Sequence, residues 1–169
     1  MLITRFNQTL DIWLRALEEY TFEQLCSQPS AVSWSAGQMY RHLIDDTGFF
    51  IEQIKICVAD HEHAEKKPTS FGMKILAEND FPDEAIVGTP GNAFIPQPLS
   101  KEQLVKDMEV LKINMNAAAL LVDESPFKGR SKHPGLGYFN AEEWLQFAEI
   151  HLRHHFRQKK RIDEFLKTL

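Results

Sequence analysis

Three helix-start signals constrain the fold of this chain more than any other feature. In each one, a serine or asparagine is followed three positions later by a glutamine or glutamate, and a run of apolar residues at helical spacing comes next. This pairing is a capping box, in which the first side chain caps the helix and the second bonds back to the backbone of the first. The three pairs are Ser35 and Gln38, Ser100 and Gln103, and Asn140 and Glu143.

These signals, with an amphipathic run at the start of the chain, predict four main helices. The predicted spans are 2–20, 36–60, 101–122 and one that begins at 141 and contains three of the seven histidines. Residues 22–26 either continue the first helix or form a short separate turn. A further short helix is expected over 70–78. We see no series of strands and no internal repeat, so residues 125–137 are expected to form a loop.

Residues 64–99 lack the helical spacing of the other segments. Prolines and glycines recur through them, as in Gly88-Thr89-Pro90-Gly91-Asn92, which predicts an irregular connection. A connection this long suits a crossover between the second and third main helices of a bundle, joining two helices that run the same way. A chain of 169 residues is also an ordinary length for one domain. The prediction is therefore an all-α four-helix bundle with a single domain over 1–169.

Composition narrows the function classes. The net charge of −5 gives no electrostatic basis for binding nucleic acid or an anionic membrane, and no helix-turn-helix with a basic recognition helix is evident. No signal peptide and no uncharged apolar run of membrane-spanning length are found, and the two cysteines form no CxxC pattern. We therefore expect a cytoplasmic protein with its cysteines reduced.

The last helix sets histidines into its apolar face. At about 100° per residue, His151 and His155 lie about 40° apart, and Trp144 and Phe147 share their face. His154 lies about 60° to the other side of His151. Leu145, Leu152 and Phe156 form a second apolar face, which could pack on a neighbouring helix or on another subunit.

The second helix also turns a histidine, His42, toward the core, and polar Gln38, Asp46 and Gln53 share its face. Histidines four positions apart on one helix can converge on one metal ion, and a third ligand from another helix leaves an open position, as in catalytic sites. Imidazole suits Zn, Ni, Cu or Fe. The alternative is that such histidines are ordinary core or surface residues, since two histidines at this spacing also arise by chance.

The other histidines have plainer predictions. His61 and His63 are expected to face solvent at a helix end, and His133 is expected in a loop. Asp46 is either a solvated helix residue or a contact of a metal-binding histidine.

The quoted residues resemble a known family. Trp34, Gly37, Gln38 and His42, the long crossover, and the C-terminal string His133-Pro134, Gly137, Glu143-Trp144, His151, His154-His155 and Arg157-Gln158 are similar to the DinB-like (YfiT-like) superfamily, and closest to an uncharacterised branch of it. The resemblance implies an up-down-down-up four-helix bundle, commonly a homodimer. It also implies a divalent metal, Zn or Ni, held by His42, His151 and His155. The family tail often reads His-Arg-Gly-Gln, whereas Phe156 follows His155 here.

Two function classes follow from this resemblance. The first is a metal-dependent enzyme acting on a small molecule, either a transferase that uses a low-molecular-weight thiol or a hydrolase, with Asp46 or His154 as candidates to orient a ligand or accept a proton. The second is a non-catalytic, stress-associated homodimer in which the metal stabilises the bundle.

Overall fold

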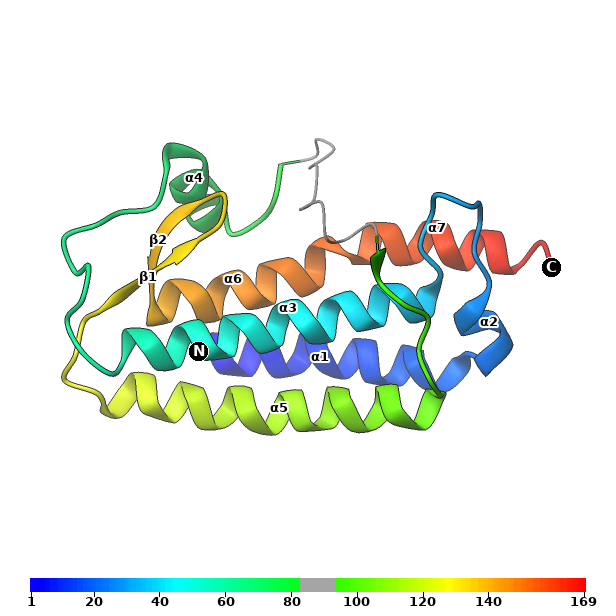
Figure 1. The fold of residues 1–169 in the computed structure, drawn as a ribbon, viewed down its shortest axis with the longest axis horizontal. Coiled ribbons are helices and arrows are strands. Elements are labelled where there is room, and N and C mark those ends of the chain that lie inside the picture. Colours follow the sequence, from blue (N-terminus) through cyan, green and yellow to red (C-terminus); the bar gives the residue numbers. More distant parts are fainter. Residues whose placement is uncertain (83–93) are drawn as a thin grey trace.

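Four long helices lie side by side and form the body of the molecule (Figure 1), in a computed structural model that describes residues 1–82 and 94–169. They are α1 (Leu2–Glu19), α3 (Ala36–Cys57), α5 (Lys101–Glu124) and α6 (Ala141–His154). The shorter elements are α2 (Phe22–Cys26), α4 (Ser70–Glu78), α7 (Phe156–Leu166), β1 (Arg130–His133) and β2 (Gly137–Asn140). The predicted all-α four-helix bundle is confirmed, and residues 22–26 form a separate short helix.

The connection between α3 and α5 crosses the length of the bundle. In Figure 1, α1 and α6 run from left to right, whereas α3 and α5 run from right to left. The chain leaves α3 at one end, forms α4 over the span expected from the sequence, and enters α5 at the other end. Gly88-Thr89-Pro90-Gly91-Asn92, expected to be irregular, lies outside the described residues.

Two of the three capping boxes form completely. The Ser35 and Asn140 side chains each accept a hydrogen bond from the backbone of the third helical residue, and Gln38 and Glu143 bond back. Of the capping box predicted at Ser100, only the first hydrogen bond forms. Ser100 accepts from the Gln103 N–H, but the Gln103 side chain donates to Asp107 at 2.6 Å. A carboxylate one turn along the helix therefore competes with the cap for this amide.

The prediction of a plain loop over 125–137 is also wrong, because residues 130–140 form a two-stranded antiparallel hairpin, β1–β2. The hairpin is held against residues 67–69, where the Tyr138 N–H donates to Lys67 O and the Thr69 N–H donates to Leu136 O. Gly137 permits this close approach, because its φ is +85° and a Cβ there would lie 2.7 Å from the Thr69 nitrogen. Two four-residue strands are too short to give a clear alternating pattern in the sequence.

The continuous histidine helix assumed in the projection is broken at His155, where α6 ends and α7 begins. The cause lies on α1. The Trp13 indole N–H donates to Leu152 O at 3.1 Å, which is the carbonyl that a continuous helix would pair with the Phe156 N–H. Phe156 then stacks on Trp13 with ring centroids 5.0 Å apart. Phe156, the first residue of α7, therefore packs on Trp13 of the same chain.

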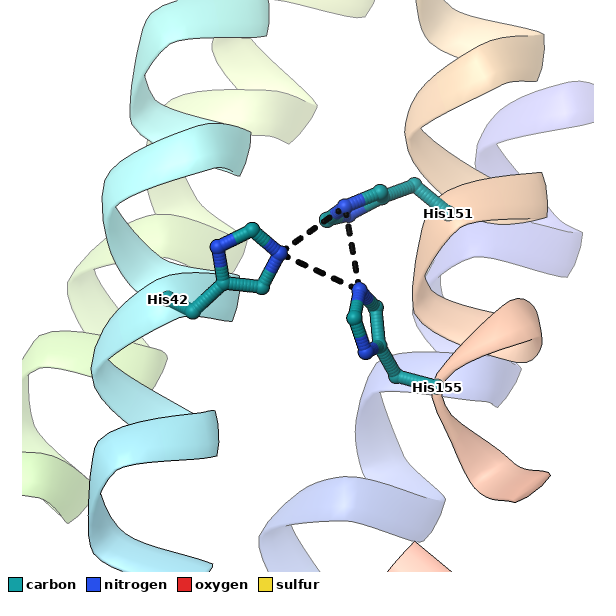
Figure 2. Close-up of side chains that lie close together, drawn as sticks. All are labelled: His42, His151 and His155. Carbon is teal, nitrogen blue, oxygen red and sulfur yellow. Dashed lines mark hydrogen bonds between the residues drawn. The ribbon is translucent and has the colours of Figure 1, made fainter. Parts of the chain in front are cut away.

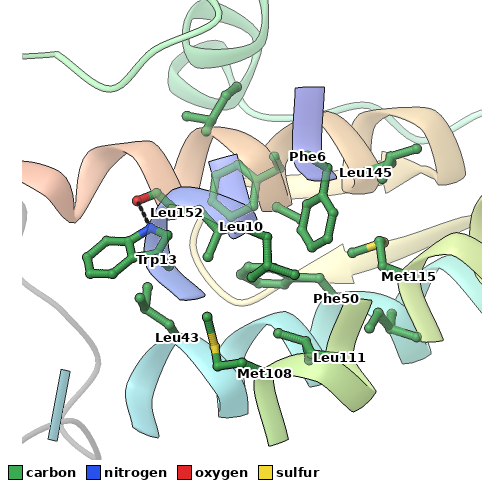
Figure 3. Close-up of a cluster of buried hydrophobic side chains, with 14 of the residues drawn as sticks. Phe6, Leu10, Trp13, Leu43, Phe50, Met108, Leu111, Met115, Leu145 and Leu152 are labelled. Atoms are coloured by element: carbon green, nitrogen blue, oxygen red, sulfur yellow. Dashed lines mark hydrogen bonds between the residues drawn. The ribbon is translucent and has the colours of Figure 1, made fainter. Parts of the chain in front are cut away.

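The core lies between the four long helices (Figure 3). Phe6, Leu10 and Trp13 of α1 are fully buried against Leu145 and Leu152 of α6 and the inner faces of α3 and α5. The second apolar face of the last helix therefore packs on a neighbouring helix of the same chain. Burying each such large side chain contributes about 1.5–3 kcal/mol.

Cys57 is buried and Cys26 is half-buried, and both are free. Among the helices that the structure describes, none combines the length and the apolar character that crossing a membrane requires.

Candidate metal centre

Three histidine rings from two helices meet at one point (Figure 2). His42 comes from the second turn of α3, His151 from the last turn of α6, and His155 from the break between α6 and α7. The His42 Nε2 lies 3.2 Å from the His151 Nε2 and 3.1 Å from the His155 Nε2, and the last two are 3.2 Å apart. The structure therefore brings together the three residues that the sequence singled out, and in each ring the Nε2 atom points toward the other two.

The size of this triangle fits a metal ion. With Zn–N bonds of about 2.0–2.1 Å, the nitrogens of a tetrahedral site are about 3.3 Å apart. Three nitrogens so placed occupy one face of a tetrahedron and leave a fourth position for another ligand. The Trp34 ring lies beside His42, with ring centroids 4.9 Å apart, and the Phe50 and His151 rings meet edge to face, with centroids 5.4 Å apart.

The protonation of the rings suits a cation at the centre. Gln158 Oε1 lies 2.8 Å from the His155 Nδ1. An amide oxygen only accepts, so the Nδ1 of His155 carries the proton and its Nε2 presents a lone pair. The Nδ1 atoms of His42 and His151 are buried without a hydrogen-bond partner, so for these two rings the convergent Nε2 atoms are the only nitrogens with close polar neighbours. With all three protons on Nδ1, the three Nε2 lone pairs would repel one another unless a cation lay among them.

Burial also keeps the rings neutral. It lowers the pKa of His42 to about 3 and that of His155 to about 4. The pKa of His151 is lowered well below its ordinary value, first by burial and then by the neighbouring His155 and His42. A neutral imidazole is the form that ligates a metal, and all three rings are in that form at neutral pH.

Asp46 lies one turn along α3 from His42 and reaches the same point. Its Oδ2 is 3.5 Å from the His42 Nε2 and 3.4 Å from the His151 Nε2, so of the two alternatives left open by the sequence, the structure shows the contact with histidine. Burial, with a smaller contribution from the charge of Asp45, raises the pKa of Asp46 to about 6. Its side chain is still 38% exposed, so a proton can pass from it to water.

His154 and His133 lie near the centre but not in it. The His154 ring packs on Phe81, with centroids 4.6 Å apart, and contacts the ring of His155. Burial, and then the charge of Arg157, lower the pKa of His154. His133, at the end of β1, packs against Phe147. Its place in a strand, and not in a loop, corrects the sequence prediction.

His61 and His63 are exposed, as predicted. Trp34 and Phe50 are the neighbours of the site that sequence reasoning missed. Trp34 immediately precedes the cap Ser35, the position from which an apolar side chain often packs back on the first turn of a helix, and this signal could have placed it.

Gln158 offers a test of the geometry. Removing its amide in Gln158→Ala frees the His155 ring to rotate and to change tautomer, so we expect metal affinity to fall about 10- to 100-fold while the fold is retained. Competition with a chromogenic chelator measures the affinity. Lys160→Ala, on an exposed face of the same helix, serves as the control and is expected to bind metal as the parent does. Equal affinities for parent and Gln158→Ala would show that the amide does not orient the ring.

Together, the fold and the site define a four-helix bundle in which two helices carry three neutral imidazoles and a carboxylate to one point. The chain belongs to the DinB superfamily, whose family model matches residues 5–158.

Two similar proteins come from Bacillus subtilis. The uncharacterised protein YuaE of strain 168 is 26% identical over 162 residues, which cover 94% of this chain and 95% of YuaE. The structure of YfiT superposes with a TM-score of 0.61 at 16% sequence identity, covering 96% of this chain and 84% of that one. YfiT is described as a probable metal-dependent hydrolase with an unusual four-helix bundle topology. At this identity the likeness supports the shared fold.

Proposed function

We propose that this protein is a divalent-metal-dependent hydrolase of a small-molecule substrate. The observation that carries the proposal is the convergence of three neutral Nε2 atoms, 3.1–3.2 Å apart, with the Asp46 carboxylate 3.4–3.5 Å from two of them. The arrangement offers three ligands, one open position and one adjacent proton acceptor.

Each residue has a distinct part in this proposal. His42, His151 and His155 hold the ion, which is Zn or Ni, and Gln158 fixes the orientation of His155. Bound there, the ion supplies a Lewis acid and lowers the pKa of a water or thiol that approaches it. Asp46 would serve as the proton acceptor for a water bound there, because its Oδ2 lies beside the ligand nitrogens and its pKa of about 6 leaves it ionised at neutral pH. Trp34 packs against the His42 ring and helps to hold it in place.

The description of YfiT as a probable metal-dependent hydrolase agrees with this reading. A carboxylate beside the histidine nitrogens favours hydrolysis, since water must give up a proton to become a nucleophile, whereas a thiol with a depressed pKa is already ionised. Transfer of a low-molecular-weight thiol and a purely structural role for the metal are the competing outcomes of the experiment.

The experiment is an activity screen of Zn-loaded and Ni-loaded protein. One panel contains p-nitrophenyl acetate, p-nitrophenyl phosphate, a p-nitroanilide and a lactone. A second combines bacillithiol, glutathione or mycothiol with 1-chloro-2,4-dinitrobenzene. Hydrolysis that His42→Ala abolishes supports the proposal. Turnover in the thiol panel alone would replace it with a transferase, and no turnover in either panel would favour the non-catalytic alternative.

Asp46→Asn separates catalysis from metal binding. The amide cannot accept the proton, so we expect kcat to fall by about 10²- to 10⁴-fold while the metal content is unchanged. The matched control is Asp45→Asn, which makes the same change at the neighbouring exposed position and is expected to retain most of the activity. A kcat for Asp46→Asn within a few-fold of the control would exclude Asp46 as the proton acceptor.

A further inference from the structure

The imidazole of His133 presents a hydrogen-bond donor that the fold does not use. Its Nδ1 accepts the Gly135 N–H at 3.1 Å, within the turn that joins β1 to β2. Burial, with no contribution from a neighbouring charge, lowers the pKa of His133 to about 4, so the ring is neutral at neutral pH and its one proton lies on Nε2. Within the part of the chain that the structure describes, this Nε2–H has no hydrogen-bond partner, and unlike the Nδ1 of His151 it is open to solvent.

His133 lies about one helical turn from the metal centre, along α6. Its ring packs on Phe147 with centroids 5.0 Å apart, and Phe147 stacks on His151 with centroids 6.3 Å apart. From Phe147 to His151 the helix rises by about 6 Å. His133 shares the inner face of β1 with Ser131, whose Oγ accepts the Trp144 indole N–H. The unused donor is therefore within reach of a small molecule whose reacting group is at the three histidines.

An exposed phenyl ring lies on the α3 side of the same region. Phe49 is one turn from Asp46 on α3 and is 41% exposed, although it meets the fully buried ring of Trp144 edge to face, with centroids 5.9 Å apart. Trp144 also contacts the ring of His133, with centroids 5.5 Å apart, so a single side chain separates Phe49 from His133. The surroundings of the donor are thus aromatic and apolar.

These surroundings favour an uncharged acceptor. No charged group contributes to the pKa of His133, so a carboxylate bound at its Nε2–H would lie against aromatic rings without a counter-ion, which is costly. A carbonyl or amide oxygen accepts the same hydrogen bond without that cost.

We propose that His133 is a substrate-binding residue, whose Nε2–H donates to an uncharged carbonyl or amide oxygen of the substrate while the reacting group lies at the three histidines. The apolar part between these two groups packs on Phe49. The inference rests on the proposed function and narrows its substrate to small molecules that carry a second, unreactive oxygen acceptor roughly 6 Å or more from the bond that reacts. The competing role for His133 is structural, to complete the turn and to fill the aromatic cluster.

Binding of paired hydroxamates to the Zn-loaded protein tests the inference without requiring turnover. The 3- and 4-acetylbenzohydroxamates each carry a metal-binding hydroxamate and a ketone oxygen across a benzene ring. The 3- and 4-isopropylbenzohydroxamates have nearly the same shape but lack the acceptor. We expect the parent to bind at least one acetyl compound about three- to tenfold more tightly than its isopropyl counterpart, as measured by isothermal titration calorimetry.

Three variants separate the donor from the ring. His133→Phe keeps an aromatic ring in the cluster but has no donor, so it should weaken binding of the acetyl compound alone and abolish the preference, with the Zn content unchanged. His133→Gln, whose amide N–H lies near the position of the imidazole Nε2–H, should keep part of the preference. Lys132→Phe makes the matched change at the exposed neighbouring position of β1 and should bind all four compounds as the parent does.

The outcomes distinguish this inference from the proposed function. Equal affinity of the parent for both members of each pair, no binding of any hydroxamate, or a preference that survives in His133→Phe would overturn the role of His133, whatever the activity screen shows. A preference that His133→Phe abolishes, in a protein that turns over no substrate of either panel, would support His133 as a binding residue and overturn the hydrolase.

Discussion

Replacing His151 and His155 together by alanine is expected to reduce the bound metal from about one ion per chain to none. These residues contribute two of the three converging nitrogens, and His42 alone offers a single ligand, too few for a stable site. The measurement is elemental analysis of untagged protein purified without added metal, followed by loading with Zn or Ni.

Thermal unfolding provides a second readout. Metal that binds only the folded protein stabilises it by about 4 kcal/mol when the free concentration is a thousand times the dissociation constant. We therefore expect added Zn or Ni to raise the melting temperature of the parent and to leave that of the His151→Ala/His155→Ala variant unchanged.

The matched control replaces the two exposed histidines in His61→Ala/His63→Asn. Asparagine is chosen at the second position because His63 has a φ of +59°, a conformation that asparagine tolerates. This control should retain one ion per chain. A parent that holds no metal and cannot be loaded with either ion would remove the basis of the proposed function and leave the three histidines as core residues.

The placement of the site could be predicted because it depends on local periodicity. The spacing of His151 and His155 places both rings on one side of a helix, and the capping box at Ser35 fixes where the helix that carries His42 begins. The direction of the His155 ring could not be predicted in the same way. His155 lies at the break between α6 and α7, where Trp13, about 140 residues away in the sequence, donates to Leu152 O.

The two errors have different causes. The hairpin at 130–140 is held by residues 67–69, a contact about 70 residues away in the sequence that a local pattern does not contain. The failed half of the cap at Ser100 has a local cause, because Asp107 lies one helical turn from Gln103 and accepts its side-chain hydrogen bond.

Trp13→Ala is expected to lower the free energy of unfolding by about 3–5 kcal/mol. The side chain is fully buried, meets Tyr40 edge-on and stacks on Phe156, and its indole N–H satisfies Leu152 O. Truncation leaves a cavity where α1, α3 and α6 meet and removes the group that fixes the break before α7. Urea unfolding of the metal-free protein measures the change.

Trp13→Phe separates packing from hydrogen bonding. It keeps an aromatic ring but leaves the buried Leu152 carbonyl without its donor, which should cost about 1–3 kcal/mol. Ile12→Ala, at a partly exposed position on the same helix, is the control and should change stability by about 0.5 kcal/mol or less. Since the break directs His155 toward His42, we also expect Trp13→Ala to bind metal more weakly than Ile12→Ala does. Equal metal affinities in these two variants would mean that the histidine geometry is set within α6 and α7 alone.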